Sequence, residues 1–301
     1  DSKTLLQVFR EHNEQSRKLI GKDFVSKTVQ RYETTTRYLE EFIKKEYQLS
    51  DIALNNLEAN FISKFDAFLK IEKGCAQNSA ITRLKNLKKI IRIALENDWI
   101  KKDPFAYYRF KLEETDPKFL TMDEIKIILA KEFTIKRVEQ VRDVFIFCVF
   151  TGLAFSDVKD LSPEHLVKDN KGELWIRKNR QKTKIMCNIP VLPVATSILE
   201  KYKNVAECTG KLLPVLSNQR MNSYLKEIAD VCGLQKNLCT HSARHSYATS
   251  ICLANGVSME NVAKMLGHAD TSVTKHYARV LDQNIFKDMQ KVNSCLSELA
   301  I

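Results

Sequence analysis

Hydrophobic residues recur at helical spacing through most of the first hundred positions of the chain. In SKTVQRYETTTRYLEEFIKKEY, residues 26–47, one face of a predicted helix carries Tyr32, Leu39, Phe42 and Ile43. Ser26 is the predicted N-cap, because its hydroxyl can accept a hydrogen bond from a free N–H of the first turn. The next segment, residues 56–74, has a similar periodicity and ends at a glycine. These patterns predict a first domain made of helices.

Two stripes run side by side along NSAITRLKNLKKIIRIALENDWI, residues 78–100. The apolar stripe consists of Leu84, Leu87, Ile91 and Leu95. The basic stripe consists of Lys85, Lys88, Lys89 and Arg92. A basic stripe is either a solvated helix face or a face that binds the phosphates of a nucleic acid, and both interpretations stay open here.

The hydrophobic pattern changes after residue 104. Residues 101–121 contain two prolines and little periodicity, and we predict a linker at 105–118. Thr121 and Glu124 form a capping-box pattern that starts a new helix. The following buried helix breaks at Gly152 and is expected to restart after Ser156. The predicted domains are therefore residues 1–104 and 119–301.

One region of the second domain predicts β-structure. ELWIRKNRQKTKIMCNIPV, residues 173–191, has two β-prone runs around a polar segment, and Pro190 closes the second run. The remainder is helical, with caps at Ser258 and Gly267 and an amphipathic stretch after Asp282. The predicted fold class is mainly α, with a small β-sheet in the second domain and a separate all-α first domain.

The net charge and the cysteine content restrict the classes of function that the protein can have. The 301-residue chain has 48 Lys and Arg against 37 Asp and Glu, a net charge of +11. The excess is divided between residues 1–118, with 23 basic and 18 acidic, and the remainder, with 25 and 19, as expected if both parts face one polyanion. No apolar run is long enough to span a bilayer. Eight cysteines without a C-x-x-C pair argue against a zinc ribbon or redox motif and favour a reduced, cytosolic protein.

Candidate chemistry gathers in THSARHSYAT and HADTSVTKHYARV. These stretches contain His241, Arg244, His245, His268 and Tyr277. Each has an ordinary explanation as a surface, capping or half-buried aromatic residue. Together, with a lysine on the predicted hairpin, they form an inventory suited to phosphoryl transfer without a metal ion. Guanidinium and imidazole groups stabilise charge on phosphate oxygens, a lysine can protonate a leaving hydroxyl, and a tyrosine can form a covalent phosphotyrosine.

The motifs THSARHSYAT, MLGHADTSVTKHY and TGLAFSDV, in this order, resemble the tyrosine recombinases, the phage-integrase family. QVFREHNEQS and DWIKKDPF give the chain a further similarity to integrases of Bacteroides-type mobile elements. The resemblance implies a SAM-like, core-DNA-binding first domain and a catalytic second domain. It also implies site-specific cleavage and rejoining of DNA through a 3′-phosphotyrosyl intermediate, without a cofactor, to integrate or excise a mobile element.

The resemblance implies a role for each site residue. Tyr277 would be the nucleophile, while Arg244, His241 and His268 would bind the scissile phosphate and assist proton transfer. Lys182 would be the acid for the leaving group. Supporting roles are implied for Asp157 and His245.

One position departs from the family pattern. Ala154 in TGLAFSD stands where the family carries its first arginine, and a methyl group cannot donate a hydrogen bond to phosphate. Arg180 is our candidate replacement, because residues i and i+2 of a strand share a face and Lys182 lies two positions on. An exposed basic residue with no such role is the other interpretation of Arg180.

The expected partner is double-stranded DNA, bound as a homotetramer on two sites and as a monomer or weak oligomer without DNA. The expected location is the bacterial cytoplasm, at the nucleoid and away from the membrane. Two alternatives remain: a catalytically impaired DNA-binding protein, with Ala154 as the lesion, or an enzyme like type IB topoisomerases. Since the sequence begins with Asp, we also expect a fragment that lacks an N-terminal module.

Overall fold

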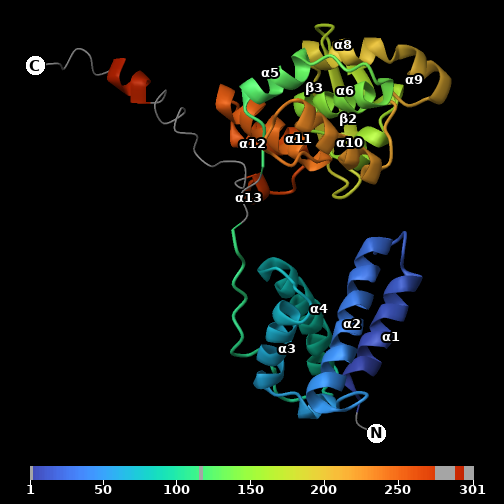
Figure 1. The fold of residues 1–301 in the computed structure, drawn as a ribbon, viewed down its shortest axis with the longest axis vertical. Coiled ribbons are helices and arrows are strands. Elements are labelled where there is room, and N and C mark those ends of the chain that lie inside the picture. The colour runs from blue at the N-terminus through green and yellow to red at the C-terminus, as the bar shows by residue number, and fades with distance from the viewer. Residues whose placement is uncertain (1–2, 115–117, 275–288, 295–301) are drawn as a thin grey trace, which may run out of the picture. The chain divides into compact units, whose positions relative to one another are not determined.

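The chain divides into two compact units, residues 1–115 and 116–301. The computed structural model describes residues 3–114, 118–274 and 289–294, without the side chains of 272 and 273. Figure 1 shows helices in both units and one small sheet in the second. The predicted fold class, mainly α with a small sheet, is confirmed. Among the described residues, no helix combines the length and the apolar character needed to cross a membrane.

The first unit is a helical bundle. Its elements are α1 (Leu5–Lys18), α2 (Ser26–Tyr47), the 3-10 helix η1 (Leu54–Asn56), α3 (Ala59–Ile71) and α4 (Gln77–Glu96). Phe42 lies at the centre of the core, with ring centroids of Phe61 and Phe65 each 5.2 Å away. Burying one such side chain stabilises the fold by about 1.5–3 kcal/mol. The apolar periodicity along α2 and α4 is therefore what holds the helices together.

The segment that follows α4 packs back onto the first unit. Phe105, within the predicted linker 105–118, is buried in the core of this unit. Asn78 binds the backbone of Glu113 twice: its Nδ2 donates to the carbonyl at 2.8 Å, and its Oδ1 accepts from the N–H at 2.9 Å. The chain is thus fastened along α4 as far as residue 113.

The second unit is built around a buried helix, α6. Its helices are α5 (Met122–Ala130), α6 (Lys136–Thr151), α7 (Phe155–Lys159), η2 (Pro163–His165), α8 (Pro193–Lys201), α9 (Lys203–Thr209), α10 (Asn218–Val231), α11 (Thr240–Ser246), the π-helix η3 (Tyr247–Cys252), η4 (Leu253–Asn255), α12 (Met259–Leu266) and α13 (Thr271–Thr274). Residues Val144 to Thr151 of α6 are all buried. This helix packs against α8, α10, α11 and η3, which explains why its second half, from Val144 onward, is apolar on every side.

A three-stranded antiparallel sheet lies beside these helices. Its strands are β1 (Leu166–Lys168), β2 (Leu174–Asn179) and β3 (Met186–Pro190), in the order β1-β2-β3. Ile176 pairs with Leu166 on one side and with Ile189 on the other. The pattern at 173–191 predicted β2 and β3. It did not predict β1, because a three-residue strand is too short to show a period of two.

Two of the predicted helix starts are confirmed and two are wrong. The capping box of Thr121 and Glu124 is confirmed at the start of α5, and Ser258 caps α12 as predicted. The prediction for Ser26 is wrong: the N-cap of α2 is Val25, and Ser26 is already helical. The restart after Ser156 is also wrong, because α7 begins at Phe155.

Candidate active site and nucleic-acid interface

Helix α11 carries the motif THSARHS and is held at its N-terminus by α10. The backbone N–H of Thr240 donates to Oδ1 of Asn222 at 2.9 Å, and the Thr240 hydroxyl donates to Oδ1 of Asn218 at 3.0 Å. Free N–H groups of a helix N-terminus need such acceptors. The two asparagines therefore fix the start of the helix on which His241 and Arg244 lie. Neither asparagine was singled out from the sequence, since nothing local links them to residue 240.

Arg244 is buried, with only 1% of its surface exposed. Its Nη1 donates to the carbonyl of Gly152 at 2.7 Å, and its Nη2 donates to the carbonyl of Leu266 at 2.5 Å. These carbonyls lie at the C-terminal ends of α6 and α12, where the helix dipole favours positive charge. The two helix ends thus hold the guanidinium in one orientation.

His268 lies against the same guanidinium. Its Nε2 is 3.0 Å from Nη2 of Arg244, and its Nδ1 is 2.8 Å from Oγ1 of Thr274. Burial, followed by the positive charges of Arg244 and Arg180, lowers the pKa of His268 to about 4. The imidazole is therefore neutral at pH 7. Because an arginine can only donate, Nε2 accepts, and Nδ1 carries the proton toward Thr274.

His241 stands at the exposed end of α11. Loss of hydration beside the neighbouring protein atoms lowers the pKa of His241, and the positive charges of Arg244, Arg180 and Lys182 lower this pKa further. The ring of His245 lies edge-on to that of His241, with the centroids 4.3 Å apart. The two histidines thus meet on one side of α11, and the neutral form of the His241 ring is favoured near neutral pH.

The turn between β2 and β3 is fastened to the same site. The hydroxyl of Thr183 donates to the carbonyl of Gly267 at 3.0 Å. The backbone N–H of Gln181 donates to Oδ1 of Asp157 at 2.8 Å. Asp157 is buried, and this bond ties it to the hairpin turn. The hairpin turn, residues 180–185, is therefore tied to α7 and to the end of α12.

Gly267 makes this approach feasible. Its φ of +61° lies in the left-handed region, and an added Cβ would come within 2.7 Å of Sγ of Cys187 and 3.4 Å of Cβ of Arg180. The glycine predicted as a helix cap is thus also the place where the hairpin meets α12. The sequence signal for the cap contained no information on this second constraint.

Arg180 lies at the start of the turn. Its side chain is half-buried, and Nε is buried without a hydrogen bond to the described residues. Its positive charge lowers the pKa of both His241 and His268. The strand argument used for Arg180 is wrong, because β2 ends at Asn179 and Lys182 lies in the turn. Lys182 is exposed, and the turn, not strand pleating, brings it near His241.

Ala154 is the N-cap of α7, and its carbonyl accepts from the N–H of Asp157 at 2.9 Å. Asp157 in turn holds Gln181, the residue after Arg180. Ala154 is thus joined to the Arg180 turn through one short chain of hydrogen bonds. Tyr277 lies outside the described residues, as does most of the amphipathic stretch after Asp282.

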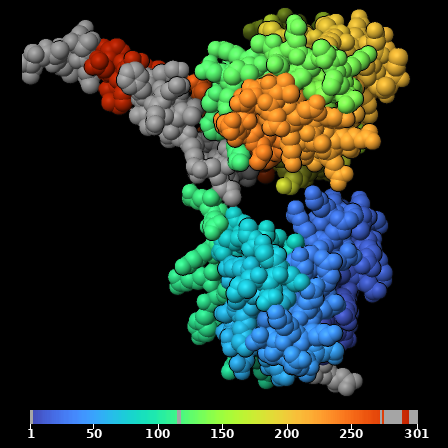
Figure 2. Space-filling model, viewed as in Figure 1, coloured from blue at the N-terminus to red at the C-terminus, as the bar shows by residue number. Residues whose placement is uncertain are grey.

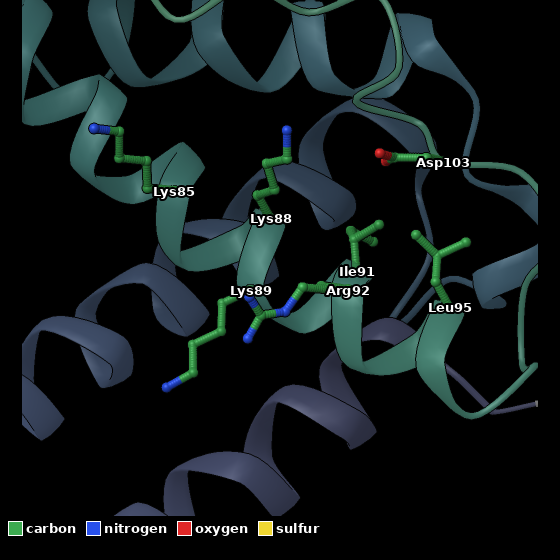
Figure 3. A pocket seen from close by; sticks show the side chains of 7 residues that line it. All are labelled: Lys85, Lys88, Lys89, Ile91, Arg92, Leu95 and Asp103. Atoms are coloured by element: carbon green, nitrogen blue, oxygen red, sulfur yellow. The ribbon is translucent and has the colours of Figure 1, made fainter.

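A second concentration of basic groups lies on α4 of the first unit. Lys85, Lys88, Lys89 and Arg92 line a hollow of about 510 Å³ together with Ile91, Leu95 and Asp103. Figure 3 shows Lys88 extending toward the side where Asp103 lies, whereas Lys89 extends the other way. Arg92 also forms an exposed ion pair with Glu96, with Nε 3.2 Å from Oε1, and such pairs contribute little.

Aromatic rings lie beside three of these lysines, and Nζ of Lys85 is 5.9 Å from the ring centre of Phe110. Nζ of Lys88 lies 5.4 Å from the ring centre of Phe110, and Nζ of Lys89 lies 5.0 Å from that of Tyr32. Lys89 also donates to the Tyr32 hydroxyl at 3.2 Å. These cation–π contacts hold the ammonium groups in place at the surface of α4, an arrangement suited to phosphate binding. The sequence predicted the basic stripe on this helix but not the aromatic rings beside its lysines.

Similar proteins of known sequence are tyrosine recombinases. XerD of Listeria monocytogenes serotype 4b is 26% identical over 291 residues, which cover 91% of this chain and 94% of the relative. XerC of Leptospira interrogans is 24% identical over 298 residues, which cover 93% of each protein.

Solved structures share the fold. The Tn1549 transposon integrase in complex with a circular intermediate DNA matches with a TM-score of 0.73 at 16% identity, over 96% of this chain and 100% of that one. A lambda integrase (75-356) dimer bound to a COC′ core site matches with a TM-score of 0.73 at 19% identity, over 93% and 98%.

Two family profiles cover most of the sequence. The profile described as "Phage integrase SAM-like domain" matches residues 4–112, and "Phage integrase family" matches residues 118–284. Taken with the basic site around Arg244, these matches show that the chain belongs to the phage integrase family of tyrosine recombinases.

Proposed function

We propose that this chain is a site-specific DNA recombinase that cleaves and rejoins strands through a covalent bond between Tyr277 and the 3′-phosphate. The observation that carries the proposal is the buried guanidinium of Arg244, fixed by Gly152 and Leu266 and in contact with His268. A rigid cationic donor beside neutral imidazoles suits an anionic phosphodiester.

In the proposed reaction, Arg244 and His241 bind the non-bridging oxygens of the scissile phosphate, and His268, whose Nε2 is an acceptor, orients Arg244 and assists proton transfer. The Tyr277 oxygen attacks phosphorus and loses its proton to a neutral imidazole of the site. The bond from phosphorus to the 5′-oxygen breaks, and Lys182 protonates that oxygen. A 5′-hydroxyl of the partner duplex then attacks the phosphotyrosine and loses its proton to Lys182. The bond from phosphorus to the Tyr277 oxygen breaks, and Tyr277 regains its proton from the imidazolium, so the strand is resealed without a nucleotide cofactor.

Arg180 takes the place of the missing family arginine in this proposal. Its charge reaches both histidines, and its turn is bound to the helix that starts after Ala154. Asp157 and His245 serve as supports: the first holds the hairpin turn, and the second packs against His241.

The first unit is proposed to bind duplex DNA through the α4 lysines, with residues 1–104 as the core-binding domain, 105–118 as the linker and 119–301 as the catalytic domain. A homotetramer would act on two sites, in the bacterial cytoplasm at the nucleoid, to integrate or excise a mobile element of the Bacteroides type. Support comes from the related structures, which include a lambda integrase tetramer bound to a Holliday junction.

The proposal can be tested by covalent trapping. A duplex that the protein binds specifically is selected from a random pool, and nicked versions of it are prepared with the nick at successive positions. The parent protein should form a complex that resists detergent, and Tyr277→Phe should bind the same duplex without forming it.

The contrary outcomes separate the alternatives. Specific binding without a covalent product from the parent, at any nick position, would contradict the proposal and favour a DNA-binding protein disabled at Ala154. Relaxation of plasmid DNA without sequence preference would instead favour topoisomerase-like activity.

A further inference from the structure

The backbone of Leu120, near the start of the second unit, is held by two buried serines. The N–H of Leu120 donates to Oγ of Ser246 at 2.9 Å, and its carbonyl accepts from Oγ of Ser250. Both serines are buried, and the Leu120 side chain is fully buried in the core. The chain that arrives from the first unit is therefore bound through both polar groups of one residue.

A third side chain holds the preceding residue. Nζ of Lys236 donates to the carbonyl of Phe119 at 3.0 Å and forms an ion pair with Glu124, with Nζ 2.7 Å from Oε2. Glu124 also closes the capping box with Thr121. In Figure 2 the green segment that includes α5 lies against the orange segment of α11 to α12 on the visible face of the unit.

The two serines belong to the helix that carries the phosphate-binding groups. Ser246 is the last residue of α11, two positions after Arg244, and its hydroxyl also donates to the carbonyl of Ser242 at 2.8 Å. The Ser246 hydroxyl thus donates its one proton to Ser242 and accepts a hydrogen bond from Leu120. Any movement of α11 along its axis would break the bond to Leu120.

Ser250 lies in a stretch with unusual geometry. The six residues Tyr247–Cys252 form a π-helix, a conformation that is rare and concentrates at functional sites. Nδ2 of Asn255 donates to the carbonyls of Ser250 and Ile251, at 3.2 and 3.0 Å. A return to α-helical bonding would rotate Ser250 away from Leu120, so the serine contact opposes that return.

We propose that Ser246 and Ser250 are positioning residues, which bind the chain at Leu120 and thereby hold α11 in the position where Arg244 and His241 can receive phosphate. This inference rests on the proposed function and adds to it a link between the interdomain segment and the catalytic helix. A displacement of about 1 Å in a catalytic group can slow a reaction about 100-fold.

The test compares Ser246→Ala and Ser250→Ala with the parent on a saturating nicked duplex. Each variant should form the covalent complex at least about tenfold more slowly, with affinity for the duplex within about twofold. Ser197→Ala is the matched control, because that exposed serine bonds to the carbonyl four residues before it, that of Pro193, and should leave the rate unchanged. Ser250→Thr keeps the hydroxyl and should restore the rate.

A second measurement needs no catalysis. In the free protein, backbone hydrogen exchange in Ser250→Ala should become faster both at 118–122 and at 240–252. Faster exchange at 118–122 alone, with α11 unchanged, would overturn the positioning role, and so would unchanged cleavage by both alanine variants. A parent protein without any covalent product would overturn the proposed function instead, and hydrogen exchange would then decide the positioning role by itself.

Discussion

Nη2 of Arg244 lies 3.0 Å from Nε2 of His268, and this contact determines which imidazole nitrogen carries the proton. The arginine donates, so Nε2 is the acceptor and Nδ1–H points at Thr274. A phosphate that enters the site would therefore meet a fixed cation and a neutral ring.

The first prediction concerns pH. The pKa of His268 is about 4 in the folded protein and about 6.5 in an unfolded chain. Between these values the unfolded state binds more protons, so stability should rise with pH. The contribution of His268 is fully present above pH 6.5 and is lost as the pH falls through 4.

This dependence can be measured by nuclear magnetic resonance titration of the His268 ring and by denaturation at several pH values. His268→Asn should show a shallower rise in stability between pH 4 and 6.5 than the parent. A titration midpoint for His268 at or above 6.5 would contradict the assignment.

The second prediction concerns Gly267→Ala. An alanine there has an unfavourable positive φ, and its Cβ would collide with Sγ of Cys187. Gly210→Ala is the control, since Gly210 has a φ of +69° but no atom within 4 Å of an added Cβ. The control should lose about 1 kcal/mol of stability, and Gly267→Ala about 2–4 kcal/mol, because overpacking adds to the backbone cost. Urea denaturation compares the two, and equal losses would contradict the close approach of the hairpin.

The third prediction concerns Arg180→Ala, which removes the proposed substitute for the missing arginine. The rate of covalent complex formation should fall about 10²- to 10³-fold, as expected when one charge-stabilising donor is lost. Arg177→Ala is the control, because Arg177 is an exposed residue of β2, the strand that leads into the Arg180 turn. An Arg180→Ala protein that cleaves DNA at the parent rate would exclude the role.

The fourth prediction concerns the basic face of α4. If Lys85, Lys88 and Lys89 each neutralise one phosphate, each change to Gln should reduce the slope of log K against log salt by about 0.9. Lys44→Gln, on an exposed position of α2, should leave the slope unchanged. Binding isotherms at several salt concentrations provide the measurement, and equal slopes for all four variants would remove α4 from the interface.

The sequence predicted features that depend on neighbouring residues. The capping box at Thr121 and the cap at Ser258 involve residues three positions apart, and both are present. The apolar stripes of α2 and α4 likewise follow from one helical period. One local prediction was wrong because either of two adjacent residues could be the N-cap: α2 is capped by Val25, not by Ser26.

The hydrogen-bond partners of Arg244 could not be predicted from the sequence, for a physical reason. Gly152 and Leu266 lie 92 and 22 positions away in the chain, and both contribute backbone carbonyls, which every residue has. No residue type marks such an acceptor. The strand argument for Arg180 was wrong for a related reason, because the length of the turn, rather than the alternation of a strand, decides where the side chains of Arg180 and Lys182 lie.

The rings beside Lys88 and Lys89 have a consequence for conformational entropy. A free lysine side chain loses about 1.5–2 kcal/mol of rotational freedom when it is immobilised. Here Phe110 and Tyr32 already restrict the two side chains in the folded protein. Much of the side-chain entropy of Lys88 and Lys89 is therefore lost when the protein folds. Only a small further loss would oppose the binding of an anion.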